Sequence, residues 1–467
     1  MSTPVIILSD LHISPYTLAP PFNDWTQLIS LLQKGWSDET ALVLNGDCFD
    51  FLAQPNRDRF LDLAGAADFV ENELNKIKQL PYGEQFFNAL TQWIQSGKRI
   101  ILIPGNHDPE LFHPEVEERF RQFLELEGAG ELFSIHQKKQ PCAMQVGSWQ
   151  VKLSHGDEFD RLNQVDVAGI HDALSRGLKK CPLPAGSLFV LDMVQVAKRA
   201  IHPTSGKRRF PFIDKLKPEM PGALLLMLYL DPVLTLRNLP GLSSTASSIV
   251  INALKRDIRA ITSGSGFLST ESQLDSEKPS ASRQLATALC HYLPREGDSS
   301  KTMLYSDLEE WLTDQDEYET NPGMLAAHNG FQRKILRIAL RALGAGDRQF
   351  EIDTPSKDDK QIYRAYEVAQ PKPTLLVAGH THAARAVEIA DNSFYINTGT
   401  WTDIVKLPGL EDPEEIQEWI GKLEADQVDT EKRLTYAEIT PENASLMQWT
   451  PSGPIPLKVF PNPNPAP

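Results

Sequence analysis

Residues able to bind metal ions or to transfer protons recur in five short segments of the chain. The segments are Asp10-Leu-His12, Gly46-Asp-Cys-Phe-Asp50, Gly105-Asn-His-Asp108, His155-Gly-Asp157 and Gly379-His-Thr-His382. Together they offer imidazole nitrogens with carboxylate and amide oxygens, which suit Mn²⁺, Fe or Zn²⁺ at a reactive site better than a cysteine-rich structural zinc site. Each segment alone is weak evidence, because an isolated Asp-x-His is more often a turn or a solvated loop.

A short apolar run precedes each segment and predicts the strand that positions it. The runs cover residues 5–8, 41–44, 99–103, 149–153 and 374–378. They read as near-continuous apolar stretches, as buried strands of parallel sheets do. Helical patterns between the early runs complete an alternation of strands and helices, at 24–34 and 83–96. This alternation predicts an α/β sandwich with its site at the carboxyl ends of the strands.

The order of the segments resembles the signature of the calcineurin-like metallophosphoesterases, which runs DxH, GDxxD, GNH(D/E), a histidine-containing loop and GHxH. The resemblance covers a small part of the chain, but all its elements occur in the right order. It implies a β-sandwich flanked by helices and two divalent metal ions (Mn, Fe or Zn), with Mn²⁺ favoured. Such ions share a bridging hydroxide and clamp a phosphoryl group during in-line displacement.

The resemblance also implies a role for each motif residue. By motif position, Asp10, His12 and His382 would bind one ion, Asn106, His155 and His380 the other, and Asp47 would bridge them. The two histidines of the last motif stand at i and i+2. An extended backbone there would turn both side chains to one face.

Three residues are implied as catalytic in the same way. In the family, the histidine at the position of His107 points at the phosphate, where it stabilises charge together with Asn106 or protonates the leaving oxygen. Asp50 resembles the carboxylate that orients this histidine and raises its pKa. Asp108 and Asp157 are interpreted as turn caps, and the thiol of the GDxxD motif as a packing residue.

The chain is divided by prediction into a core that is interrupted by an insertion. Residues 1–160 form the first part of the phosphoesterase core, 161–370 a mostly helical insertion or cap, 371–450 the second part of the core, and 451–467 a Pro-rich extended tail. Within the insertion, 198–217 carries seven basic residues and one acid. This basic segment is either a phosphate-gathering surface or a solvated loop. The apolar run 223–230 is interpreted as a buried helix, with an acyl-chain groove or dimer contact as the alternative.

One group within the family shares the placement of this insertion. The UDP-2,3-diacylglucosamine pyrophosphohydrolases also carry a helical cap after their HGD loop, and that cap holds lipid chains. The insertion of this chain is much longer, and it has His107 where those enzymes typically have arginine. The resemblance therefore suggests a nucleotide-lipid or another phosphorylated metabolite as substrate, without assigning that activity.

Composition limits the classes of binding partner and the cellular compartment that we expect for the protein. The formal net charge of −16 disfavours broad binding to nucleic acid, although peripheral lipid contact stays open. Four scattered cysteines without a CxxC pair, together with the lack of a signal peptide or a transmembrane run, predict a cytoplasmic protein. We expect a small phosphorylated molecule as substrate. The alternatives are a nuclease-like phosphodiesterase and an inactive metal-binding scaffold that binds a protein through the cap.

Overall fold

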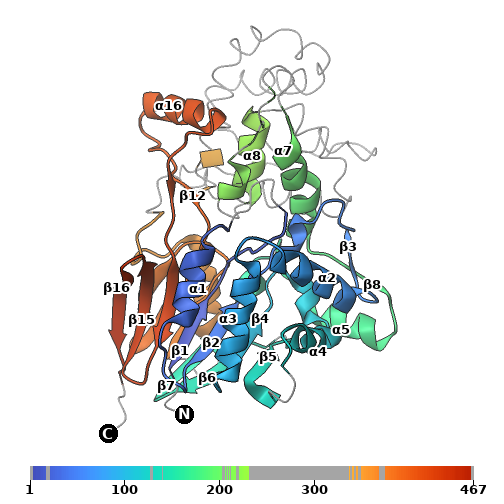
Figure 1. Cartoon of the computed structure of the whole chain (residues 1–467). Helices are drawn as coiled ribbons and strands as arrows, with labels where there is room; N and C mark the ends of the chain where they lie inside the picture. Colours follow the sequence, from blue (N-terminus) through green and yellow to red (C-terminus); the bar gives the residue numbers. More distant parts are fainter. Residues whose placement is uncertain are drawn as a thin grey trace. The chain divides into compact units, whose positions relative to one another are not determined.

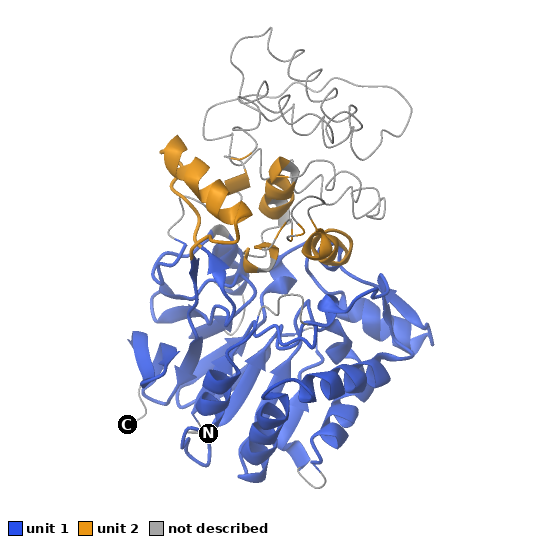
Figure 2. Cartoon of the chain, turned by 45° about the horizontal axis from the view of Figure 1, so that its top comes forward, with its two compact units in different colours: residues 1–187, 348–405, 430–467 blue, residues 188–347, 406–429 orange. Residues whose placement is uncertain are grey.

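The chain forms two compact units, each built from more than one stretch of sequence. The computed structural model describes residues 4–16, 22–126, 130–138, 140–201, 206, 208, 210, 212–216, 220–230, 336, 339–340, 343–344, 349–367 and 374–463. Unit 1 comprises Met1–Ser187, Arg348–Val405 and Thr430–Pro467; unit 2 comprises Leu188–Asp347 and Lys406–Asp429 (Figure 2). Residues 161–187 and 348–370 of the predicted insertion therefore belong to the same unit as the motifs.

A seven-stranded sheet carries the first three motifs of unit 1. Its order is β16-β15-β14-β1-β2-β4-β5. The strands are β1 (Val5–Leu8), β2 (Ala41–Asn45), β4 (Ile100–Ile103), β5 (Phe133–Ile135), β14 (Thr435–Ile439), β15 (Asn443–Thr450) and β16 (Gly453–Pro461). The first four run parallel to one another, so their carboxyl ends meet at one edge of the sheet.

A five-stranded sheet carries the other two motifs, in the order β10-β11-β9-β7-β6. Its strands are β6 (Cys142–Val146), β7 (Trp149–Leu153), β9 (Leu375–Ala378), β10 (Arg385–Ala390) and β11 (Ser393–Asn397). Strand β9 pairs in parallel with both β7 and β11. The predicted strands that precede the motifs are thus all present, within one residue at each end.

Residue alternation along the strands divides the core of unit 1 into layers. Val5 and Ile7 pack into a cluster with residues of the five-stranded sheet, whereas Ile6 and Leu8 pack on the other side against helices. Figure 1 shows α1 and α3 on that side of β1, β2 and β4. The far face of the five-stranded sheet is covered by α15, through Ile362. Unit 1 is therefore a β-sandwich flanked by helices, as predicted.

The remaining elements of unit 1 connect and cover the sheets. The helices are α1 (Trp25–Gln33), α2 (Ala66–Lys78), α3 (Gly83–Gln95), α4 (Pro114–Phe123), α5 (Val167–Ser175) and α15 (Lys357–Glu367), with α6 (Ala185–Phe189) at its boundary. Single 3₁₀ turns are η1 (Phe51–Ala53), η2 (Pro109–Phe112), η3 (Gly130–Leu132) and η4 (Asp157–Phe159). Two small sheets pair β3 (Phe60–Asp62) with β8 (Lys180–Pro182), and β12 (Ile404–Val405) with β13 (Thr430–Glu431).

The described residues of unit 2 form helices, loops and an isolated β-bridge between Ile201 and Arg208. The unit contains a π-helical turn η5 (Val190–Val194), α7 (Gln195–Arg199), η6 (Ile213–Lys215), α8 (Met220–Leu230) and α16 (Pro413–Glu424). In α8 the side chains of Ala223 to Met227 are buried, which fits the interpretation of this apolar run as a buried helix. The start of α16 is encoded locally: Asp412 accepts the backbone N–H of Glu414 at 2.8 Å, and Pro413 follows it. Within the basic segment 198–217, residues 202–205, 207, 209, 211 and 217 lie outside the described residues.

The Pro-rich segment at the end of the chain is extended, but it is also part of the sheet. Strand β16 pairs antiparallel with β15 at the edge of the seven-stranded sheet, with Trp449 opposite Pro454 and Met447 opposite Pro456. An edge strand tolerates proline because one row of its backbone groups needs no partner strand. The prediction of a separate tail at 451–467 did not include this pairing. No helix among the described residues combines the length and apolarity that a membrane span requires.

Candidate metal centre

The motif residues leave their strands on tight turns that bring them together at the edges of the two sheets. Backbone bonds join these turns: Asp10 donates to the carbonyl of Gly46, and Gly379 donates to the carbonyl of His155 at 2.8 Å. A second connection runs between the sheets, where the side chain of Asn45 donates to the carbonyl of Ser154 at 2.9 Å. Residues from five separate loops therefore face one another across the top of the sandwich.

Several of the predicted ligands hold a backbone conformation that costs free energy. Positive φ angles occur at Asp10, His12, Asp47, His380 and His382, at values between 49° and 67°. Non-glycine residues adopt this region uncommonly, and such strain, of order 1–3 kcal/mol each, concentrates at functional sites. The expected extended backbone at His380 and His382 is therefore wrong. The chain turns sharply there because these residues follow β9 directly and fold back toward Asp10.

One group of ligand atoms is formed by Asp10, His12 and His382, as the motif positions imply. Candidate ligand atoms of the three residues lie within 4.8 Å of one another. The Nε2 atoms of His12 and His382 are 2.9 Å apart, and that of His382 is 3.4 Å from Oδ1 of Asp10. Asp10 is fully buried and His12 nearly so. Ring nitrogens that converge at this distance fit two ligands of a common cation.

Asp47 lies between this group and His155. Its Oδ2 is 3.9 Å from Nε2 of His12 and 3.3 Å from Nε2 of His155. A second group of ligand atoms within 4.8 Å consists of Asp10, Asp47 and His155. Asp47 thus reaches one histidine of each predicted ion, as a bridging carboxylate would.

Buried polar atoms without a protein partner indicate whether a cation fits the site predicted for the second ion, at Asn106 and His155. Oδ1 of Asn106 and Nε2 of His155 are both buried and make no hydrogen bond within the described residues. The other ring nitrogen of His155 lies 3.1 Å from the carbonyl of Asn45, which only accepts hydrogen bonds. That contact requires a proton on Nδ1, so Nε2 is the ring nitrogen that faces Asp47 and can bind a metal. Such orphaned acceptors are costly unless a donor or a cation satisfies them, so the residues present fit a metal ion.

His380 lies beside His155, the other histidine that the motif positions imply for the second ion. Its ring lies edge-on to that of His155, with centroids 5.3 Å apart. Among the described histidines, cysteines and carboxylates, no group of three mutually close ligand atoms includes it. Its Nε2 is 3.3 Å from Oδ2 of Asp160. A carboxylate on Nε2 leaves Nδ1 as the ring nitrogen for a metal.

The electrostatics of the site follow from burial and from close opposite charges. Burial opposes ionisation of Asp47, but the charges of His155 and His107 outweigh it and hold the pKa of Asp47 well below its ordinary value. In the same way, the hydrogen bond with His382 outweighs burial and lowers the pKa of Asp10. Burial and the charge of His107 lower the pKa of His12 to about 3. Anionic carboxylates beside a neutral imidazole are the protonation states that metal ligation requires.

Comparison with known proteins agrees with this geometry. Residues 3–181 match the family described as calcineurin-like phosphoesterase. This part of the chain is a domain of the calcineurin-like metallophosphoesterase superfamily. No curated protein matches the chain. The matched range ends before His380 and His382, so only the folded structure connects these two residues to the motifs of the calcineurin-like domain.

The residues implied as catalytic in this calcineurin-like site are also brought together. Nδ1 of His107 is 2.9 Å from Oδ1 of Asp50, and its backbone N–H donates to Oδ1 of Asp47 at 2.8 Å. Burial lowers the pKa of His107, but Asp47 and Asp50 outweigh it and raise the pKa to about 9. His107 also lies edge-on to His12, with ring centroids 4.7 Å apart. The carboxylate of Asp50 thus holds the imidazole of His107 beside His12 and favours its protonated form.

Two other motif residues have the structural roles that were predicted for them. Asp108 accepts the backbone N–H groups of Gly105 at 2.6 Å and Phe49 at 3.2 Å, and so ties two motif loops together. Cys48 is buried, and burial raises the pKa of its thiol well above the ordinary value. Such a thiol packs in the core and is a poor nucleophile.

Sequence reasoning missed two residues that support the histidines. Asp160 contacts His380, and the hydrogen bond from His380 outweighs burial and lowers the pKa of Asp160 to about 2. The backbone carbonyl of Asn45 orients His155. Neither has a motif of its own. The only available signal was that Asp160 follows the HGD motif within one turn.

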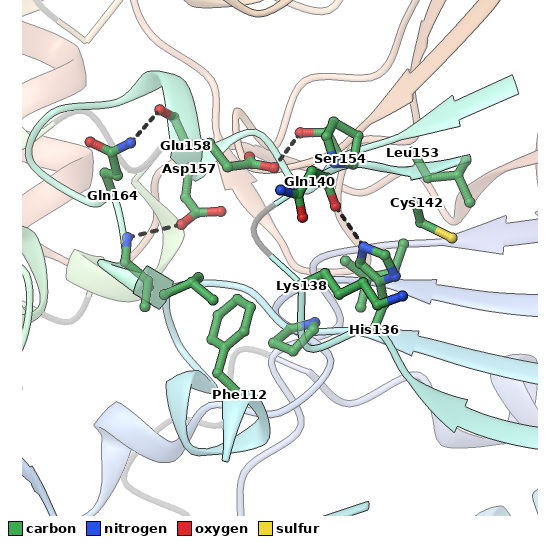
Figure 3. Close-up of a pocket in the computed structure, with 15 residues that line it drawn as sticks. Phe112, His136, Lys138, Gln140, Cys142, Leu153, Ser154, Asp157, Glu158 and Gln164 are labelled. Carbon is green, nitrogen blue, oxygen red and sulfur yellow. Dashed lines mark hydrogen bonds between the residues drawn. The ribbon is translucent and has the colours of Figure 1, made fainter. Parts of the chain in front are cut away.

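Residues of the HGD loop and of the strands β4, β6 and β7 line a cavity of about 80 Å³ (Figure 3). Its wall includes Asp157, Glu158 and Lys138, but none of the seven predicted metal ligands. Two of its acidic side chains are engaged in the wall itself: Glu158 accepts from Ser154 at 2.7 Å, and Asp157 accepts the backbone N–H of Val165 at 3.3 Å. The cavity is smaller than the roughly 300–1,000 Å³ that pockets for small molecules occupy.

Proposed function

We propose that this calcineurin-like protein is a binuclear-metal hydrolase of phosphate esters or pyrophosphates. The observation that carries the proposal is the position of Asp47, within 3.9 Å of His12 on one side and 3.3 Å of His155 on the other. Asp10, His12 and His382 would hold one ion, and Asn106, His155 and His380 the other. When bound, two divalent ions supply Lewis acidity to a phosphoryl group and a nucleophile at neutral pH.

The chain's own residues would do the remaining work. Asp50 holds Nδ1 of His107, so that Nε2 is the nitrogen free to donate a proton or a hydrogen bond to the phosphoryl or leaving oxygen. The side-chain amide of Asn106 would share the stabilisation of developing negative charge. Asp160 and the carbonyl of Asn45 fix the orientations of His380 and His155, so that these rings need not reorganise during the reaction.

Metal analysis and a substrate panel test this proposal together. The protein, purified and reconstituted with Mn²⁺, is expected to retain two ions per chain and to hydrolyse at least one class among phosphomonoesters, phosphodiesters and nucleotide-lipid pyrophosphates. Zn²⁺ and Fe²⁺ reconstitution would rank the metals. Two bound ions without turnover of any class would favour the inactive scaffold. Turnover confined to oligonucleotides would favour the nuclease-like alternative.

We further propose that the insertion selects the substrate, a small phosphorylated molecule. The support is the basic segment 198–217 in a chain of net charge −16. Replacement of Arg208 and Arg209 by alanine is expected to raise KM for a multiply phosphorylated substrate more than for a small aryl phosphate, which does not need remote charges. Arg176→Ala, at an exposed ion pair of α5, is the control for loss of positive charge alone. A parallel change for both substrates would refute selection by these arginines.

We propose, separately from the activity, that the protein is located in the cytoplasm. Three of the four cysteines, Cys48, Cys142 and Cys181, are free and buried. Free thiols support the expected cytoplasmic location, because an oxidising compartment favours disulfides. Fractionation of cells that express the tagged chain would test it.

A further inference from the structure

A buried carboxylate on α15 makes contact with the loop that carries the last two predicted ligands. Asp359 is fully buried. Its Oδ2 accepts the backbone N–H and the hydroxyl of Ser356, at 2.9 Å and 2.7 Å, and lies 3.5 Å from Nε of the buried Arg385. One oxygen of the carboxylate is thus held by Ser356, which directly precedes α15, and by a neighbouring cation.

The other oxygen of Asp359 faces β11 and the Gly379–His382 loop. Oδ1 accepts the hydroxyl of Tyr395 at 2.9 Å, the side-chain amide of Asn397 at 3.3 Å and the hydroxyl of Thr381 at 3.4 Å. Burial and the charge of Asp359 raise the pKa of Tyr395 well above its ordinary value, so this phenol stays a donor. Thr381 lies between His380 and His382 in the chain, and a contact to its hydroxyl therefore acts on both.

Asn397 extends the contact to the main chain of the same loop. Its side-chain N–H₂ donates to the carbonyl of Gly379 at 2.8 Å and lies 3.1 Å from the Thr381 hydroxyl oxygen. Its side-chain oxygen accepts the backbone N–H of Gly399 at 2.9 Å. The turn that holds His380 and His382 at positive φ is therefore hydrogen-bonded at Gly379 and at Thr381.

We propose that Asp359 is a positioning residue of the metal centre, which holds the strained turn of His380 and His382 through Thr381 and Asn397. The inference rests on the proposed metal-binding function. A buried carboxylate is costly unless donors surround it, and here donors converge on it from Ser356 before α15, from β11 and from the ligand-bearing turn. A carboxylate needed only for packing would not have to face that turn.

Asparagine at this position is a sharp perturbation, because the carboxylate accepts hydrogen bonds on both oxygens. An amide presents one acceptor and one donor. In either orientation its N–H₂ would face a group of donors, either those of Ser356 or those of Tyr395, Thr381 and Asn397. The positive φ angles at His380 and His382 would then lose one of the contacts that maintain them.

The test compares Asp359→Asn with Asp358→Asn, which removes the same charge from the adjacent residue of α15. Asp358 accepts from Gln361 on the exposed side of the helix. Mn²⁺ binding to each metal-free variant is measured by titration calorimetry, and Co²⁺ absorption spectra report the ligand geometry. Loss of an outer contact typically costs 10–100-fold in metal affinity. We expect about that loss, with an altered Co²⁺ spectrum, in Asp359→Asn and wild-type behaviour in Asp358→Asn.

A lower melting temperature with wild-type Mn²⁺ affinity and Co²⁺ spectrum in Asp359→Asn would overturn the positioning role. If that variant does not fold, Thr381→Val, which removes only the hydroxyl between the two histidines, serves instead, with the same expected direction and the same refuting result. Hydrolysis is measured separately. A wild-type chain that binds Mn²⁺ but cleaves no phosphate ester would refute the proposed activity alone, and the affinity comparison would still decide the role of Asp359.

Discussion

Replacement of His107 by alanine separates catalysis from metal binding. The substitution removes the imidazole but keeps the backbone N–H that donates to Asp47 at 2.8 Å, so the bridging carboxylate keeps its contact. We expect two ions per chain, as in the wild type. The rate should fall by roughly 10²–10⁴-fold if the imidazole acts as a general acid, which corresponds to about 2.7–5.4 kcal/mol in the barrier.

The size of the loss should depend on the leaving group. p-Nitrophenolate leaves without a proton, whereas an alkoxide does not, so kcat/KM for an alkyl ester should fall further than for the p-nitrophenyl ester. Metal content of the same samples is the control. Equal losses across leaving groups would refute the proton-donor role and leave charge stabilisation. Loss of metal in His107→Ala would refute the expectation that His107 contributes to catalysis without contributing to metal binding.

Asp50→Asn provides the companion measurement, because Asp50 acts on substrate only through His107. Asp50 raises the pKa of His107, and the protonated donor exists below that pKa. Loss of the carboxylate lowers the pKa, so the fall in rate on the alkaline side should move to lower pH. The double variant should be no slower than His107→Ala alone. Additive losses would show that Asp50 has a separate role.

Three further changes test the site and the fold around it. Asp47→Asn should lose most activity and lower the metal content, since one carboxylate neutralises two cations; two retained ions with full turnover would contradict the bridging role. Gly105→Ala should also lose metal, because a Cβ there would lie 2.2 Å from Oδ1 and 2.6 Å from the backbone N of Asp47; Gly421→Ala, with open space, is the control. Arg57→Met should destabilise the fold by about 3–5 kcal/mol in urea unfolding, because it leaves the buried Glu110 unpaired; recovery in Arg57→Met/Glu110→Leu would confirm the cause.

The strands and the motif loops were predictable because their signals are local. A run such as 149–153 encodes a buried strand by itself, and the polar residues that follow it must lie at the end of that strand. The supporting residues carry no such signal. Asp359 sits in a charged helix and was assigned to the insertion, and only the pairing of β9 with β11 brings Tyr395 and Asn397 beside it.

Other misses have the same origin in long-range structure. The proline-rich composition of 451–467 predicts an extended tail. The edge position of β16, where proline is tolerated, cannot be known before the sheet order is known. The i, i+2 spacing of His380 and His382, taken alone, predicts an extended backbone at His380. Its φ of 67° arises from the return of the chain toward Asp10, whose carboxylate accepts the His380 N–H at 3.1 Å.

The carboxylates of the site are oriented by the main chain of other loops, and this determines how the centre is organised. Asp10 accepts the backbone N–H of His380, and Asp47 accepts that of His107. Each N–H belongs to a loop that follows a different strand. The orientation of each carboxylate is therefore fixed only when the strands that carry these loops have assembled. The four groups are therefore positioned jointly. Substitution of the histidine side chains leaves this main-chain frame in place, whereas a change that displaces a loop, such as Gly105→Ala, moves a carboxylate. For this reason we expect side-chain variants to lose rate or single ligands, and loop variants to lose the centre as a whole.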